Sequence, residues 1–399
     1  MIYTADYLFP VNEPPIRNGF VECDENGVIL SHGVFDPAIF DGRSVVKCRG
    51  FLVPGFTNAH CHLELSYLKG MFRQGTGMDG FIRQINELRT TVDAASRLDS
   101  IEKSFDCLVS QGVTCMGDIS NCDETFEVKK EKADLLFTRT FLEVFGTEPE
   151  DAQSILAGAE ELQRKASSMG LLAAPTPHSC YTMSPLLNRI TAVKGLESGY
   201  ISYHSQESDE EEDMLRYGTG PLAEDYRQRG TTQLPVTGTG ALEYFIDNLS
   251  KSVEMPVSGN VLLVHNVALD QRSIDVALKK LKNPYWVLCP LSNIFIHRAL
   301  PPVGLMRGNK LKICIGTDSL SSNTVLSIVD EIKCLQDNFP DVPLDEMIRW
   351  ACLNGAEAIG CSDRFGSMEN GKTPGIVLIS EVDTENVKLT DKSKSTRLV

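Results

Sequence analysis

The sequence predicts an α/β fold, a (β/α)8 TIM barrel with a small β-domain built from both chain termini. Three observations support this prediction. Apolar runs rich in β-branched residues recur through the middle of the chain, and segments with helical periodicity separate them. Both ends of the chain instead alternate short β-like runs with turn residues. Because buried parallel strands are continuously apolar, runs that alternate with helices indicate βαβ units.

Eight apolar runs provide the strands that a closed barrel needs. In chain order, the candidate strands are residues 51–59, 113–118, 136–145, 171–175, 200–204, 261–265, 285–289 and 313–318. We therefore assign residues 51–364 to the barrel, and residues 1–50 together with 365–399 to one composite β-sandwich domain. A doubly wound open sheet is the alternative, but the glycine pattern of residues 75–80 lacks the preceding strand that a dinucleotide site requires.

Charge and cysteine content exclude several classes of protein. The 399 residues include 38 Lys and Arg against 54 Asp and Glu, a formal net charge of −16, so nucleic acids and anionic membranes are poor partners. No apolar run reaches the roughly 18 residues of a membrane span, and no signal-peptide pattern is present. Twelve cysteines without a C-x-x-C pair are typical of reduced, buried thiols. We expect a cytoplasmic protein.

The positions of the histidines are the strongest functional signal. The chain has seven histidines, and five lie at or just beyond the carboxyl end of a candidate strand. These five are His60, His62, His178, His204 and His265. Active sites of (β/α)8 barrels are built at this end of the strands, so the five imidazoles are expected on the catalytic face.

Four strand-end residues form a candidate metal site. His60 and His62 are two residues apart in an extended segment and therefore point the same way. His204 ends its strand with a third imidazole, and Asp318 ends the last strand with a carboxylate. Three imidazoles and one carboxylate suit Zn²⁺ or Fe²⁺ and leave a position open for water. We expect one divalent metal per chain.

Three further residues are placed to act beside this metal. Glu207, three residues after His204, is a candidate general acid and base. His265 is placed to hydrogen-bond the developing tetrahedral centre. His178 can position the substrate or act as a further ligand. Two-metal barrel hydrolases commonly carry a modified lysine at the end of this fourth strand, and the strand has no lysine, which favours one metal.

Six segments together resemble a known family. In chain order they are PGFTNAHCHLE (54–64), APTPHSCYT (174–182), HSQE (204–207), VLLVHNV (261–267), CPLSN (289–293) and GTDSLSSN (316–323). They resemble the motifs of the amidohydrolase superfamily, in the branch of guanine, S-adenosylhomocysteine and aminofutalosine deaminases and triazine chlorohydrolases. The resemblance covers nearly the whole chain, because the terminal β-segments also look like that branch's β-domain.

The resemblance implies a mononuclear metal site on the four residues above, with Glu207, His265 and Asp318 in catalysis. It further implies that several residues line or brace the substrate pocket, namely Glu64, Ser292, Asn293, Ser319 and Asn323, beside His178 at the end of its strand. Turn chemistry or strand-end capping is the alternative role for each of these five. The expected reaction is hydrolytic deamination of an amino-substituted nitrogen heterocycle, purine-like or nucleoside-like, with release of ammonia. The stretch of residues 69–90 is expected to overhang the pocket and to influence substrate choice.

Other functions remain open at this stage. The same site could remove chloride from an activated ring or open a cyclic amide, because an activated water attacks any such sp² carbon. A non-catalytic barrel that acts as a scaffold is a third possibility, although such relatives typically lose metal-site histidines. The expected partners are a small heterocyclic substrate and water, with a homodimer as the expected assembly.

Overall fold

The computed structural model describes residues 1–399 and contains a barrel of eight parallel strands. The strands are β6 (Phe56–Cys61), β7 (Val113–Ser120), β8 (Phe137–Val144), β9 (Leu172–Pro177), β10 (Tyr200–Ser205), β11 (Val257–His265), β12 (Leu281–Leu288) and β13 (Ile313–Ile315). Strands β6, β7, β8 and β9 pair in parallel in that order, and so do β10, β11, β12 and β13.

Hydrogen bonds at two seams close these strands into one barrel. Between β9 and β10, the backbone N–H of His204 donates to the carbonyl of His178 at 2.9 Å. Between β13 and β6, the N–H groups of Thr317 and Asp318 both donate to the carbonyl of His60 at 3.0 Å. The predicted (β/α)8 fold is confirmed, and the two seams already bring four of the predicted site residues to the same end of the barrel.

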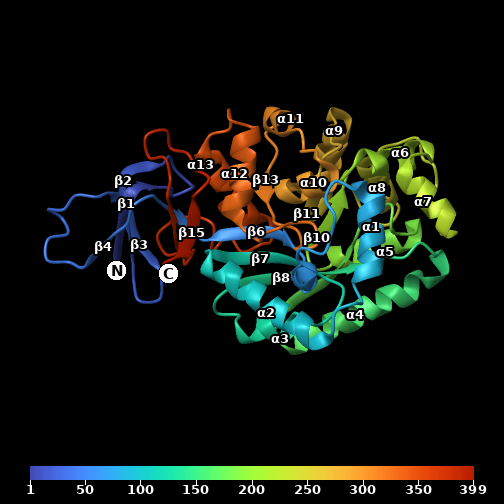
Figure 1. Ribbon diagram of the computed structural model, residues 1–399, viewed down its shortest axis with the longest axis horizontal. Helices are drawn as coiled ribbons and strands as arrows, with labels where there is room; N and C mark the ends of the chain where they lie inside the picture. The colour runs from blue at the N-terminus through green and yellow to red at the C-terminus, as the bar shows by residue number, and fades with distance from the viewer.

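Helices cover the outside of the barrel (Figure 1). Those of the first half are α1 (Gly77–Leu88), α2 (Ala94–Ser110), α3 (Phe126–Glu131), α4 (Ala152–Ser168) and α5 (Pro185–Leu196). Those of the second half are α6 (Asp209–Tyr217), α7 (Pro221–Arg229), α8 (Ala241–Leu249), α9 (Gln271–Lys280), α10 (Pro290–His297), α11 (Val303–Gly308), α12 (Ile328–Asn338), α13 (Leu344–Arg349) and α14 (Gly355–Ala358). Short turns of other helix types are η1 (Leu63–Leu68), η2 (Pro149–Asp151) and η3 (Trp350–Asn354). No helix is long and apolar enough to cross a membrane.

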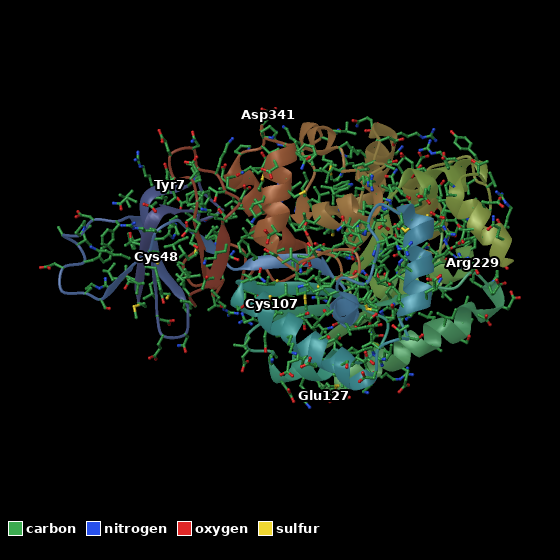
Figure 2. The ribbon with its side chains drawn as sticks, in the orientation of Figure 1. Tyr7, Cys48, Cys107, Glu127, Arg229 and Asp341 are labelled. Carbon is green, nitrogen blue, oxygen red and sulfur yellow. The ribbon has the colours of Figure 1, made fainter.

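The two chain ends form a seven-stranded sheet beside the barrel. Its strands are β1 (Ile2–Leu8), β2 (Ile16–Cys23), β3 (Ile29–Val34), β4 (Val45–Lys47), β5 (Phe51–Pro54), β14 (Ile376–Ser380) and β15 (Lys394–Arg397). Figure 2 shows Tyr7 of β1 and Cys48, the residue after β4, at one end of the molecule and Arg229 at the other. These strands make one sheet, whereas a sandwich has two packed sheets. The division of the chain into two domains at residues 50 and 365 stays a prediction.

The first candidate strand, residues 51–59, is in fact two strands. Gly55 separates β5, which pairs with β1 and β14 in the terminal sheet, from β6 of the barrel. A Cβ at Gly55 would lie 2.3 Å from the side chain of Thr114 and 2.4 Å from the carbonyl oxygen of Pro374. The chain therefore crosses from the sheet to the barrel at a place with no room for a side chain. The continuous apolar pattern conceals this break because both strands are buried.

Gly316, at the end of β13, provides a test of the barrel seam. A Cβ at Gly316 would lie 2.8 Å from the carbonyl oxygen and Cβ of His60, and 2.9 Å from its nitrogen, so backbone would have to move. We expect Gly316→Ala to lower the free energy of unfolding by about 1–3 kcal/mol, the usual range for overpacking. The matched control is Gly158→Ala in α4, where a Cβ meets nothing within 4 Å; it should raise stability by about 0.4–1 kcal/mol. Urea denaturation measures both, and equal effects would contradict the prediction.

Candidate metal centre and active site

Three histidines from two strands meet at the carboxyl end of the barrel. His60 lies near the end of β6, His62 directly follows that strand, and His204 lies near the end of β10. All three are buried, and one ring nitrogen of each lies within 4.8 Å of the others. The Nε2 atoms of His60 and His62 are 3.2 Å apart. Two strands that are distant in sequence thus bring three imidazole nitrogens to one point, as the strand-end positions predict.

Asp318 completes the cluster from the segment that follows β13. Its Oδ1 lies 3.5 Å from Nε2 of His62 and 3.8 Å from Nε2 of His60. Its Oδ2 accepts hydrogen bonds from the hydroxyls of Ser292 at 2.6 Å and Ser322 at 2.8 Å. Because these serines hold one carboxylate oxygen, the other is kept facing the two histidines.

The chemistry of this donor set fits a divalent cation. Burial lowers the pKa of His60 and of His204 well below the usual value for histidine, and the neighbouring imidazoles lower it further. Both rings are therefore neutral at physiological pH, the form in which imidazole binds a metal. Neutral imidazoles with one carboxylate suit Zn²⁺ and Fe²⁺ equally. The residues present fit one such ion.

Glu207 lies beside this cluster and contacts two further histidines. Its Oε1 is 3.5 Å from Nε2 of His265 and 3.8 Å from Nε2 of His297. Burial alone would raise the pKa of Glu207, but the interactions with the adjacent His265 and His297 outweigh it and lower the pKa to about 2. The carboxylate is therefore ionised at neutral pH and able to accept a proton.

Asn293 determines the tautomer of His265. The amide Nδ2 of Asn293 lies 3.1 Å from Nδ1 of His265. An amide nitrogen only donates, so Nδ1 of His265 accepts and its ring proton resides on Nε2. That proton faces Glu207. His265 thus presents an N–H donor to the region between the carboxylate and the metal cluster.

A pocket opens over the cluster, and α1 forms its apolar wall. The apolar side chains along this wall are Leu65, Met78, Phe81, Ile82 and Ile85. The reacting side of the pocket is lined by His62, His178, His204, Glu207, His265, Asp318 and Ser319. Residues 69–90, predicted to overhang the pocket, contain α1 and so supply most of the apolar wall. The carboxylate of Glu210 accepts the N–H groups of Met78 and Asp79, which fixes the start of α1.

The six residues expected to contact substrate occupy different places. His178 and Ser319 line the pocket, and Nδ1 of His178 is held by the hydroxyls of Ser179 and Thr182 at 2.8 and 2.9 Å. The other four have side chains engaged with protein partners. These engaged residues are Ser292 with Asp318, Asn293 with His265, Asn323 with Glu331 and the carbonyl of Thr317, and Glu64 with Ser120, Asn121 and Cys122.

Two ionisable side chains near the cluster were not among the predicted site residues. Glu143, at the end of β8, lines the pocket next to His204. His297, the last residue of α10, is partly buried, and its Nε2 lies 3.8 Å from Oε1 of Glu207. The strand-end position of Glu143 was a usable signal. The position of His297 was not, because a histidine at a helix end has no predictable direction relative to the barrel axis.

Comparison with protein families agrees with this geometry. Residues 51–397 match the model of the amidohydrolase family. The chain belongs to this family. The predicted family is thereby confirmed, and the protein is a metal-dependent hydrolase.

Known amidohydrolases similar to this one span most of its length. An aminodeoxyfutalosine deaminase of Nitratiruptor sp. is 26% identical over 82% of this chain and 78% of its own. A 5-methylthioadenosine/S-adenosylhomocysteine deaminase of Desulforamulus reducens is 25% identical over 85% and 75%. The crystal structure of Helicobacter pylori aminofutalosine deaminase with methylthio-coformycin superposes with a TM-score of 0.81 at 22% identity and covers all of both chains. That superposition shows the shared fold.

Glu211 makes the stability of this amidohydrolase depend on pH. Its carboxyl accepts the backbone N–H of Glu207 and the thiol of Cys180, both at 2.8 Å. Burial raises the pKa of Glu211 to about 8, and the charge of Glu212 adds to this effect. The folded protein therefore retains a proton that the unfolded chain releases near pH 4.5, so stability falls as the pH rises from about 4.5 to 8.

We expect Glu211→Gln, which has the shape of the protonated group, to remove this dependence. Wild type and variant should unfold alike near pH 5, and the variant should be increasingly more stable towards pH 8, by at most about 1.4 kcal/mol per pH unit. Denaturant titrations from pH 5 to pH 9 measure it, with the exposed Glu150→Gln as control. Parallel stability curves for wild type and E211Q would show that Glu211 does not titrate in this range.

Proposed function

We propose that this amidohydrolase deaminates an amino-substituted nitrogen heterocycle, purine-like or nucleoside-like, by hydrolysis with release of ammonia. One observation carries the proposal: an ionised carboxylate, Glu207, and an N–H donor, His265, face the same point beside three imidazoles and Asp318. Deamination needs a proton acceptor and donor at one carbon, and this arrangement provides both. The names of the relatives, which are deaminases, support the same reaction.

In this proposal His60, His62, His204 and Asp318 hold one divalent metal ion, Zn²⁺ or Fe²⁺. When bound, such an ion supplies Lewis-acid activation of water at neutral pH. Ser292 and Ser322 keep Asp318 facing the histidines. Because Asp318 is the one carboxylate among these four ligands, a bound divalent ion would keep a net positive charge, which would stabilise an attacking oxygen.

Glu207 carries the protons. As water attacks the amino-bearing carbon, the Glu207 carboxylate takes one proton from it and transfers that proton to the adjacent ring nitrogen. The N–H of His265 stabilises the negative charge on the attacking oxygen. The oxygen's remaining proton then moves to the amino group through Glu207, the C–N bond breaks, and ammonia leaves. One water is consumed for each ammonia released.

The pocket walls favour a flat, partly apolar ring. The side chains of α1 cover one side of the pocket and exclude water from the reacting carbon. The opposite side has polar groups, among them His178 and Asn121. Direct substrate contacts by Glu64, His178, Ser292, Asn293, Ser319 and Asn323 stay predictions, as does a homodimer.

The test is ammonia release by metal-loaded protein across a panel of substrates. The panel contains amino-purines, their nucleosides, amino-pyrimidines and amino-triazines, with chlorotriazines and cyclic amides as alternatives. We expect ammonia from the purine or nucleoside group. Chloride release or ring opening without ammonia would overturn deamination, and silence from protein that binds no metal would favour the scaffold interpretation.

A further inference from the structure

Glu143 is a buried carboxylate next to the metal cluster to which the proposed reaction assigns no role. It lies at the end of β8, its side chain is 3% exposed, and it lines the pocket. A carboxylate is costly to bury unless it is paired or hydrogen-bonded, so its partners indicate what it does. Those partners are Asn121, just after β7, and His204 on β10.

The two oxygens of Glu143 face different groups. The side-chain amide of Asn121, just after β7, donates to Oε2 at 3.3 Å and to the backbone carbonyl of Glu143 at 2.9 Å. Asn121 thereby fixes the direction of the carboxylate. The other oxygen, Oε1, is buried and has no well-formed hydrogen bond. It lies 3.3 Å from Nδ1 of His204.

Two acceptors therefore converge on one nitrogen of His204. The carbonyl oxygen of His178 also lies 3.3 Å from Nδ1 of His204. A nitrogen that faces a carbonyl oxygen and a carboxylate carries the ring proton, because neither neighbour can donate one. The tautomer of His204 is then Nδ1–H, and the lone pair on Nε2 is left to bind a cation.

We propose that Glu143 is a positioning residue that holds Nδ1–H of His204 and so directs Nε2 of that ring to the metal. Carboxylates that hold the far nitrogen of a ligating histidine fix its ring and raise its basicity, and their loss typically lowers metal affinity 10- to 100-fold. Glu143 acts on metal binding through His204, and the proposal rests on the function proposed above only in taking His204 as a ligand.

The experiment measures Zn²⁺ affinity of the full chain by competition with a chromophoric chelator, and Zn²⁺ content by elemental analysis. Glu143→Leu should bind Zn²⁺ 10- to 100-fold more weakly than wild type. Glu143→Gln keeps an acceptor oxygen and should recover most of the affinity. The matched control is Glu150→Gln, an exposed change on the segment after β8 that should have no effect. Thermal unfolding of the metal-free proteins checks that each variant folds.

Each outcome bears on the proposal. Unchanged affinity in folded E143L would overturn it. So would two Zn²⁺ per wild-type chain with one lost in E143L, because Glu143, His178 and His204 would then form a second metal site. If E143L fails to fold, Asn121→Leu frees the carboxylate instead, and unchanged affinity there overturns the proposal as well. His204→Ala distinguishes a failure of the proposed metal site from a failure of the role of Glu143. Normal Zn²⁺ affinity in H204A would refute the metal site itself. Weak Zn²⁺ binding in H204A with normal binding in E143L would refute only the role of Glu143.

Discussion

Glu207→Gln should lower kcat of the deamination by about 10²- to 10⁴-fold while the protein keeps its fold and its metal. The reason is the ionisation of Glu207, whose pKa is lowered to about 2 by His265 and His297. Glutamine has nearly the same shape but cannot take a proton from water. KM should change little, because the substitution removes an interaction made in the transition state and not the walls of the pocket.

Steady-state kinetics with the best substrate of the panel, together with elemental analysis, measure this effect. The matched control is Glu150→Gln, which changes an exposed carboxylate that neither lines the pocket nor touches the cluster. Near-normal turnover of metal-loaded E207Q would remove Glu207 from proton transfer. A loss of metal in E207Q would instead show that Glu207 is a ligand.

The gathering of the metal-cluster residues was predictable from sequence because barrel topology leaves little choice. Parallel strands of one barrel end at the same face, so residues that end distant strands must converge there. His60, His204 and Asp318 each end a strand or directly follow one, and the H-x-H spacing adds His62 on the same side. The structure brings all four together, as this reasoning requires.

Side-chain partners were less predictable, because they depend on distances that a sequence does not contain. Ser292 and Asn293 were expected to line or brace the pocket, but the sequence does not say which partners they hold; their side chains are directed to Asp318 and His265. The turn of α10 after β12 decides this, and its angle is set by packing. Glu143 ends a strand as the histidines do, so the same positional rule, applied to carboxylates, would have found it.

Lys129→Met should destabilise the protein by about 3–5 kcal/mol, the largest stability effect that we expect from a single substitution away from the site. Lys129 on α3 and Asp118 on β7 are fully buried, and Nζ lies 2.5 Å from Oδ2. Lys129 also donates to the hydroxyl of Thr140 at 2.8 Å. Methionine fills much of the same volume but leaves the Asp118 carboxylate buried without a counter-charge, which is the costly part.

Urea denaturation measures this effect, and the adjacent residue provides the control. Lys130 is 53% exposed, so Lys130→Met should change stability by less than about 0.5 kcal/mol. The double variant Lys129→Met with Asp118→Leu removes both charges and should recover much of the loss, since a buried ion pair adds little over apolar packing. A double variant no more stable than K129M would contradict that explanation.

The same pair links stability to the metal centre. Oδ1 of Asp118 accepts the N–H of Leu63 at 2.9 Å, and Leu63 directly follows His62. Removing Asp118 therefore frees the backbone that sets the position of His62, whereas K129M leaves that hydrogen bond in place. The double variant should thus be more stable than K129M and yet bind Zn²⁺ more weakly. If the double variant recovered both stability and Zn²⁺ affinity, Asp118 would not hold His62. The two measurements therefore separate a stabilising role of Asp118 from a positioning role.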